Sequence, residues 1–354
     1  MEGLVKQKYF YLPELDSLRF FAFLSVFASH FCLHSGLGSL AMIANVGAHG
    51  VDLFFALSAY LLTELMLREK DSNCLGRLDV RAFYVRRALR IWPLYYGFLL
   101  IAFCATLAYP VSGIPPRSFA MYAALLGDFP IAAPSSLIVV SLWSISLEEQ
   151  FYLIWPNVMQ RLSRRGAAAA GALLWLCCLV LRLYVLASGR GLFWLTPLIH
   201  VDSIACGVLI SGLRLGARPR LWVAGAILWI APTLYIYYGN PNALLVTVGF
   251  AFIGAGSGAF LLSAMGTTWM RRDTTVYLGR ISYGLYVYHG TAIVAASWLL
   301  APCAAWVKWP GVPLASFVAT VAVSAASYRW FETPFLKLKE RFQYVRSQPF
   351  KEPA

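Results

Sequence analysis

The sequence predicts an all-α integral membrane protein, and its composition and the spacing of its apolar residues carry that prediction. Of the 354 residues, 60% are hydrophobic and 13% are charged, and the mean hydropathy is +0.66. A soluble domain has a smaller apolar share and about twice as many charges. The apolar residues also gather in runs of roughly 20, the length that a helix needs to cross a bilayer. We therefore expect a polytopic bundle of about ten transmembrane helices.

Ten apolar runs define the expected spans, with boundaries that hold to within a few residues. They lie near residues 15–34, 46–67, 91–109, 138–159, 167–187, 197–213, 221–238, 243–264, 277–299 and 312–330. If the N-terminus is cytoplasmic, 24 of the 29 Lys and Arg fall in cytoplasmic segments, and only Arg117, Arg190 and Lys308 fall in outer loops. This asymmetry follows the positive-inside rule and predicts that both termini are cytoplasmic.

The net charge of +13 is explained by those cytoplasmic segments and does not indicate a nucleic-acid partner. No basic run alternates with an exposed aromatic platform of the kind that binds nucleic acid. The seven Cys show no metal-ligand spacing, so we expect no metal site. We expect residues 1–336 to form one transmembrane domain and residues 337–354 to form a basic cytoplasmic tail, solvated or lying against lipid.

The first span carries ionisable residues, which are costly inside a bilayer and therefore indicate a functional site. Arg19 and His30 are eleven residues apart, so a helix points them within about 20° of each other and separates them by about 16 Å. One helix face then presents a cation toward one side of the membrane and an imidazole toward the other. The structural alternative is that Arg19 extends to the interface while His30 is an ordinary interior histidine.

The second and third expected spans add charges near their ends. Asp52 lies a turn or two below the outer surface, where a lone carboxylate needs a partner or a water-filled cavity. A contact between Asp52 and His30 across the first two helices is geometrically plausible. Arg86, Arg87 and Arg90 precede the third span, and Arg87 and Arg90 share a helix face that suits bidentate phosphate binding. The positive-inside rule alone is the alternative explanation of these arginines.

The fourth span contains two adjacent glutamates, Glu148 and Glu149, which a helix points about 100° apart. Ser144, Glu148 and Tyr152 form a polar stripe along this helix, whereas Glu149 aligns with apolar residues. We therefore expect Glu148 to face the polar interior of the bundle.

The later spans carry further polar residues. Arg182 in the fifth span and Asp202 in the sixth are intramembrane charges, and pairing with each other would satisfy both. The ninth span adds Tyr286 and His289, three residues apart and therefore on one helix face.

Five segments carry a resemblance to a known family. LDSLRFFAFLSVFASH resembles the R-x10-H first helix of the acyltransferase-3 family, membrane-bound O-acyltransferases that modify bacterial glycans, and NVGAHGVDLFFALSAYLL resembles its second-helix signature, with Ala59 where Gly is usual. FYVRRALRIWPLYY resembles its R-x-x-R segment, WSISLEEQFYLIWP its W-S-x-x-x-E-E-Q-F-Y motif, and ISYGLYVYH its late S-Y-x-L-Y-x-x-H motif. These segments occur in family order from residue 13 to about 334. His200 is a departure, because the family more often has Arg there. Some relatives carry a fused extracytoplasmic esterase-like domain, which we do not expect here.

The resemblance implies transfer of an acyl group, usually acetyl, from a cytoplasmic acyl-CoA cosubstrate to a sugar hydroxyl at the outer face, with no bound cofactor. His30 is then the general base toward the acceptor hydroxyl, and a covalent acyl-histidine is the alternative. Glu148 or Asp52 orients the His30 ring or holds its positive charge. Arg19 holds the carrier phosphates or steadies the thioester carbonyl.

The remaining site residues follow from the same resemblance. Arg87 and Arg90 are expected to bind the donor phosphates, with Arg86 beside them. Substrate contacts are expected from Ser144, Glu149, Tyr152, Tyr286 and His289.

The expected acceptor is an extracytoplasmic glycan, such as O-antigen, capsule, exopolysaccharide or peptidoglycan, and the expected location is the bacterial plasma (inner) membrane, with its lipids as partners. The alternative from another class is a transporter or flippase of a glycan or a lipid-linked intermediate. The sequence shows no inverted repeat of the kind that many transporters contain. Product mass distinguishes the two, because only an acyltransferase changes the mass of the glycan.

Overall fold

The computed structural model describes residues 10–342 apart from 36–39, 73–75, 109–113, 130–135, 190–196 and 198. Among these described residues it contains helices and turns but no strand, which confirms the all-α class. In chain order the elements are α1 (Pro13–His34), α2 (Ala41–Gly47), α3 (Gly50–Ser72), α4 (Val80–Ala108), α5 (Pro116–Ala123), α6 (Leu137–Val140), α7 (Leu142–Arg161), α8 (Arg164–Ala187), α9 (Val201–Gly212), α10 (Leu221–Tyr238), α11 (Ala243–Ala264), η5 (Thr268–Arg271), α12 (Asp273–Arg280), α13 (Ser282–Leu299), α14 (Ala305–Ala326), η6 (Ser327–Glu332), α15 (Thr333–Lys339) and η7 (Glu340–Phe342).

Within the described residues, eight helical segments are long and apolar enough to cross a membrane: α1, α2–α3, α4, α6–α7, α8, α10, α11 and the segment from α14 to η7. The chain is therefore a multi-pass membrane protein. The sixth and ninth expected spans correspond to α9 and α13, which are not among the eight. α9 has only 12 residues, about 18 Å of helix, which is shorter than the hydrocarbon core of a bilayer. The count of ten crossings and the orientation of the termini stay predictions.

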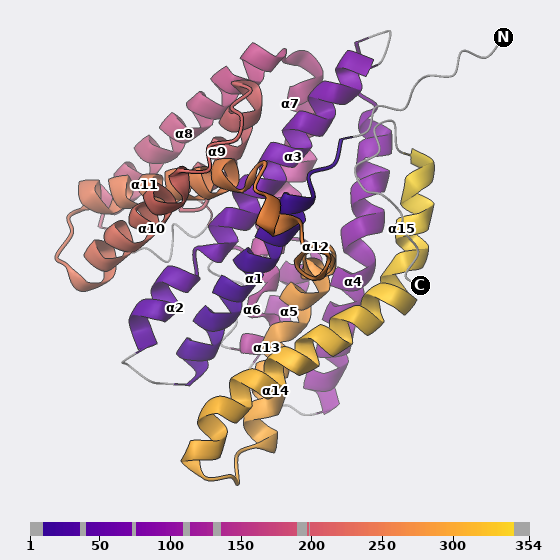
Figure 1. Cartoon of the computed structure of the whole chain (residues 1–354), viewed down its shortest axis with the longest axis vertical. Helices are drawn as coiled ribbons and strands as arrows, with labels where there is room; N and C mark the ends of the chain where they lie inside the picture. Colours follow the sequence, from indigo (N-terminus) through magenta and orange to yellow (C-terminus); the bar gives the residue numbers. More distant parts are fainter. Residues whose placement is uncertain are drawn as a thin grey trace.

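Two helices, α1 and α3, form the centre of the bundle (Figure 1). α8 to α11 lie on one side of them, and α4 and α13 to α15 lie on the other. The central helix α3 is far more buried than α8 on the side of the bundle, since 78% of the apolar window in α2–α3 is buried but only 17% of the window in α8. The two central helices carry Arg19, His30 and Asp52.

Glycines allow the helices around this centre to approach closely. A Cβ atom on Gly207 of α9 would lie 2.2 Å from the Ala56 carbonyl oxygen of α3, and one on Gly279 of α12 would lie 1.8 Å from the Asp16 carbonyl oxygen of α1. No other residue fits at such distances, because every other side chain begins with a Cβ atom. These contacts set how deeply α9 and α12 pack against the central pair.

The last long helix bends before the chain leaves the bundle. α14 continues through the π-helical turn Ser327–Glu332 into α15, and α15 packs against α4. Pro334 lacks an N–H for a regular α-helical bond, and the Thr333 hydroxyl donates to the Tyr328 carbonyl across this turn at 2.6 Å. The expected domain boundary at residue 337 falls inside α15, and residues 337–342 are helical, while the division into a domain and a tail stays a prediction. The rest of that expected tail, 343–354, lies outside the described residues.

Candidate active site

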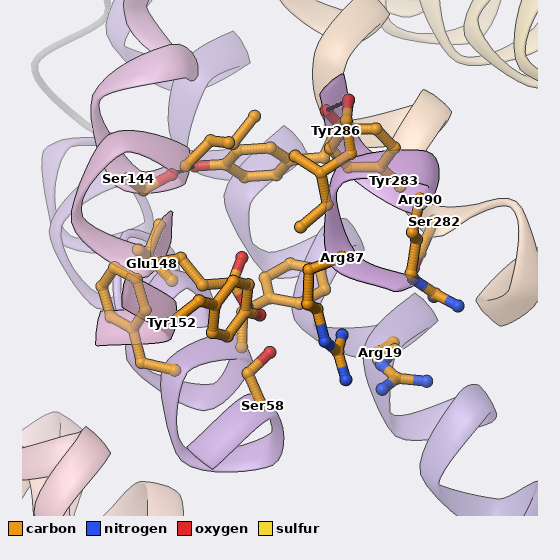
Figure 2. A pocket seen from close by; sticks show the side chains of 15 residues that line it. Arg19, Ser58, Arg87, Arg90, Ser144, Glu148, Tyr152, Ser282, Tyr283 and Tyr286 are labelled. Atoms are coloured by element: carbon orange, nitrogen blue, oxygen red, sulfur yellow. Dashed lines mark hydrogen bonds between the residues drawn. The ribbon is translucent and has the colours of Figure 1, made fainter. Parts of the chain in front are cut away.

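A polar cavity of about 90 Å³ lies among α1, α3, α4, α7 and α13, and we call it the central pocket. Arg19, Arg87 and Arg90 line one end of it, and Ser144 and Tyr286 lie together at the other (Figure 2). The pocket is therefore cationic at one end and closed by two hydroxyl groups at the other.

Arg87 and Arg90 are the two arginines of α4 that line the central pocket. Arg87 and Arg90 both line it, which confirms that they share a helix face. In the part of the chain that the structure describes, neither has an ion-pair or hydrogen-bond partner. The Arg87 guanidinium lies over the ring of Tyr152, 5.1 Å from its centroid. Two half-buried guanidinium groups without carboxylate partners favour the binding of an anion.

Arg19, in contrast, is held by a neighbouring carboxylate. It forms an ion pair with Asp16 at 2.7 Å, and Asp16 also accepts a hydrogen bond from the Tyr11 hydroxyl at 2.9 Å. Burial and the charge of Asp16 raise the pKa of Tyr11 to about 12, so this hydroxyl keeps its proton near neutral pH and remains a donor. Arg19 thus adds to the pocket a positive charge that is already paired with Asp16.

Arg86 lies outside the central pocket, which corrects its expected place beside Arg87 and Arg90. It pairs with Glu69 at 3.0 Å and donates to the Phe342 carbonyl at 2.7 Å. One step along a helix rotates a side chain by about 100°, so Arg86 cannot share the face of the other two.

The two glutamates of α7 separate as predicted. Glu148 lines the central pocket and accepts a short hydrogen bond from the Tyr152 hydroxyl. Glu149 does not line it, which corrects its expected substrate contact. Its carboxylate accepts a hydrogen bond from the Trp92 indole at 2.8 Å, and its other oxygen is buried without a partner among the described residues.

A chain of hydrogen bonds leads from the closed end of the pocket to His30. The hydroxyls of Ser144 and Tyr286 bond at 2.7 Å. The Tyr286 carbonyl oxygen lies 2.7 Å from Nδ1 of His289, and Nε2 of His289 lies 2.7 Å from Nδ1 of His30. His30 itself does not line the pocket. The expected stripe on α1 is therefore divided, with Arg19 in the pocket and His30 beyond Tyr286.

This chain of bonds determines which imidazole nitrogen is free. A carbonyl oxygen only accepts, so Nδ1 of His289 carries the proton of that bond. Neutral His289 then has a lone pair on Nε2, and Nδ1 of His30 must donate to it. The remaining lone pair is on Nε2 of His30, which is the atom that a general base needs.

Asp52 does not contact His30, and this corrects the Asp–His contact expected across the first two helices. Its carboxylate accepts from His49 at 3.1 Å, from His200 at 2.9 Å and from the Ser203 hydroxyl at 2.9 Å. These three partners leave the carboxylate fully engaged on the side of α3 that faces α9. His200, noted in the sequence only as a departure from the family, is thus the interhelical partner of Asp52.

The other intramembrane charges pair as expected. Arg182 forms a short, completely buried ion pair with Asp202. Ser58 of α3 lines the central pocket beside Tyr152 (Figure 2), although no pattern in its apolar run points to it. Across the described residues, no group of three His, Cys, Asp or Glu side chains is placed to hold a metal ion.

The fold and this site define a multi-pass helical membrane protein with an interior arginine-lined pocket and a histidine pair next to it. Residues 12–329 match the family model described as an acyltransferase domain, acyltransferase-3. The chain therefore belongs to the acyltransferase-3 family. No solved structure matches it.

Curated relatives carry names that agree with this family. The chain is 29% identical over 336 residues to "Putative peptidoglycan O-acetyltransferase YrhL" of Bacillus subtilis (strain 168), a match that covers 82% of this chain and 50% of that protein. It is 24% identical to "Putative O-acetyltransferase SACOL0978" of Staphylococcus aureus (strain COL), covering 95% and 59%. It is 23% identical to "Peptidoglycan O-acetyltransferase OatA" of Listeria monocytogenes, covering 92% and 56%. The chain thus spans between 50% and 59% of the length of these three relatives.

Proposed function

We propose that this protein transfers an acyl group, most simply acetyl, from acyl-CoA to a hydroxyl group of a glycan outside the cytoplasm. The observation that carries the proposal is the connection between the two halves of the site. Free guanidinium groups line one end of the central pocket, and the residue at its other end, Tyr286, is bonded to the His289–His30 pair. Such a site has an anion-binding end for a phosphorylated donor and a base for its reactive end.

The donor is proposed to bind through its phosphates at the arginine end. Arg87 and Arg90 present forks that match phosphate oxygens, and Arg19 adds a third guanidinium that Asp16 keeps in place. The thin pantetheine arm then extends along the pocket past Glu148 and Tyr152. The hydrogen bond between Ser144 and Tyr286 closes the far end, so we expect this bond to open when the thioester reaches His30.

The reaction itself needs one base and one leaving group. Nε2 of His30 takes the proton of the acceptor hydroxyl while the hydroxyl oxygen attacks the thioester carbonyl carbon. A new C–O bond forms and the C–S bond breaks. The CoA sulfur leaves as a thiolate and receives the proton from the His30 imidazolium. The lone pair of His289 faces Nδ1 of His30 throughout and stabilises the positive charge on its ring.

This proposal changes the roles expected for the carboxylates. Asp52 serves packing between α3 and α9, because its oxygens are occupied by His49, His200 and Ser203. Glu148 contributes to the lining of the donor path. The acceptor class follows the names of the relatives, two of which are named for peptidoglycan, and the plasma membrane is the proposed location.

The test is mass spectrometry of the surface glycans from matched strains that express no protein, the wild-type protein or the His30→Ala variant. Each transferred acetyl group adds about 42 Da, and we expect His30→Ala to lower the modification at least 100-fold because a general base is lost. The variant must be present at the wild-type level in the membrane.

His34→Ala is the matched control, since His34 lies one turn further along α1, is exposed and, among the described residues, forms a hydrogen bond only with Ser297. It should keep wild-type modification. If His30→Ala keeps the mass increment, the catalytic assignment is wrong. If deletion changes only the amount of glycan and never its mass, the protein is not an acyltransferase.

A further inference from the structure

Lys339, the last residue of α15, is a buried basic residue that has no counter-charge among the described residues. Only 9% of this residue is exposed. In the described part of the chain its ammonium group has no hydrogen-bond or ion-pair partner. A buried charge is costly unless it is paired, so the position calls for an explanation.

The surroundings of Lys339 increase that cost. α15 packs against α4, and Leu336, which is one helical turn before Lys339 on the same face of α15, lines a small hollow together with Arg90 of α4. The neighbouring acid is Glu340. Glu340 is exposed, so its attraction is weakened by solvent.

The buried acids of this region have other partners. Glu69 binds Arg86, and Glu332 accepts from the Ser327 hydroxyl. Neither carboxylate has a contact with Lys339, so the described residues leave this side chain without a counter-charge.

Two arginines of α4 connect this region with the central pocket. Arg87 and Arg90 line that pocket, and Arg90 also lines a small hollow with Leu336 of α15. Arg87, Arg90 and Lys339 therefore gather three cations that lack ion pairs within the described residues at the place where α15 meets α4. We call these three residues the α4–α15 cluster.

We propose that the α4–α15 cluster binds the nucleotide phosphates of the acyl-CoA donor, and that Lys339 is a phosphate-binding residue of this protein. Three like charges in a partly dry environment repel one another until a polyanion neutralises them. This inference rests on the proposed function, because it takes its ligand from it. Lys339 lies beyond residues 12–329, the segment that the family model matches.

The experiment measures binding to the full chain in phosphatidylcholine nanodiscs by calorimetry, with CoA and with pantetheine, which lacks the nucleotide and its phosphates. The variant is Lys339→Met, which keeps the apolar stem and removes the charge. We expect it to bind CoA about tenfold more weakly, the effect of losing one charge-assisted contact, and to bind pantetheine like the wild type. Arg341→Ala is the matched control, because Arg341 is basic and exposed two residues away. It should leave both affinities unchanged.

A second readout separates ligand binding from a structural role. Without ligand, Lys339→Met should unfold at a higher temperature than the wild type, because a buried repulsion is removed. With CoA it should gain less stability than the wild type gains. Lys339→Arg should restore CoA binding.

The inference is overturned if Lys339→Met binds CoA like the wild type, if it weakens pantetheine equally, or if it unfolds at a lower temperature without ligand. It is also overturned if nanodiscs containing phosphatidylglycerol stabilise the wild type through Lys339 while CoA does not, since the ligand is then a lipid headgroup. If the wild type itself fails to bind CoA, the donor of the proposed function is wrong, which is a different result.

Discussion

His289 forms hydrogen bonds with both His30 and the Tyr286 carbonyl. It accepts from His30 and donates to the backbone of its own helix, 2.7 Å from each partner, and it is completely buried. A ring bonded at both nitrogens has one orientation and one tautomer. His289 is therefore a positioning residue for His30 in the proposed reaction.

This role predicts different outcomes for two substitutions of His289. Glutamine carries both a donor and an acceptor, so His289→Gln can maintain both bonds and should keep a substantial part of the transfer activity. Leucine fills the space without bonding, so His289→Leu should lower kcat by about 10- to 100-fold and leave KM for acyl-CoA nearly unchanged. The measurement is steady-state kinetics of CoA release by the purified protein. Equal activity of the two variants would show that the bonds of His289 do not matter.

At the scale of elements, the position of α9 depends on one glycine. Gly207 brings α9 against the backbone of α3 at Ala56, and this contact places His200 and Ser203 beside Asp52. A wider separation would leave the Asp52 carboxylate with unpaired oxygens in a buried site, which costs free energy.

Gly207→Ala is therefore expected to destabilise the protein by about 1–3 kcal/mol, the usual cost of overpacking a close contact. The measurement is thermal unfolding of the purified protein in one detergent. Gly216→Ala is the matched control, since a Cβ atom there would meet nothing within 4 Å, and it should change the unfolding temperature little. A Gly207→Ala variant as stable as the wild type would mean that α9 can move away from α3 without cost.

At the scale of the whole molecule, the distribution of basic residues predicts the orientation. The N-terminal segment, residues 68–90 from the end of α3 into the start of α4, and the segment from Arg329 onward together carry 15 of the 29 Lys and Arg (2, 7 and 6). The positive-inside rule places all three on the cytoplasmic side. The arginine end of the central pocket then faces the compartment in which acyl-CoA is made.

Reporter fusions test this orientation. A fluorescent protein that folds only in the cytoplasm should be bright when fused after residue 354, and an alkaline phosphatase fused there should be inactive. The phosphatase should be active when it replaces the segment between α4 and α5. The reverse pattern would place the proposed donor site on the wrong side of the membrane.

Helical periodicity predicted which residues of the site share a face of the same helix. The eleven-residue spacing of Arg19 and His30, the shared face of Arg87 and Arg90, and the separation of Glu148 from Glu149 all depend on about 100° per residue. The same rule explains why Arg86 is turned away. Helical periodicity does not indicate which helix faces pack against each other. The sequence therefore pointed to Asp52 or Glu148 as the partner of His30, whereas the structure shows that the partner is His289.

The sequence by itself determined the helical class, the family and the faces that carry the polar residues, because these depend on local composition and on spacing along one helix. The tertiary structure decided the partners. Asp52 meets His200 because Gly207 lets α9 approach α3. Lys339 is buried against α4 because the turn Ser327–Glu332 redirects the last helix. Such contacts join residues that are far apart in the chain, and only packing brings them together.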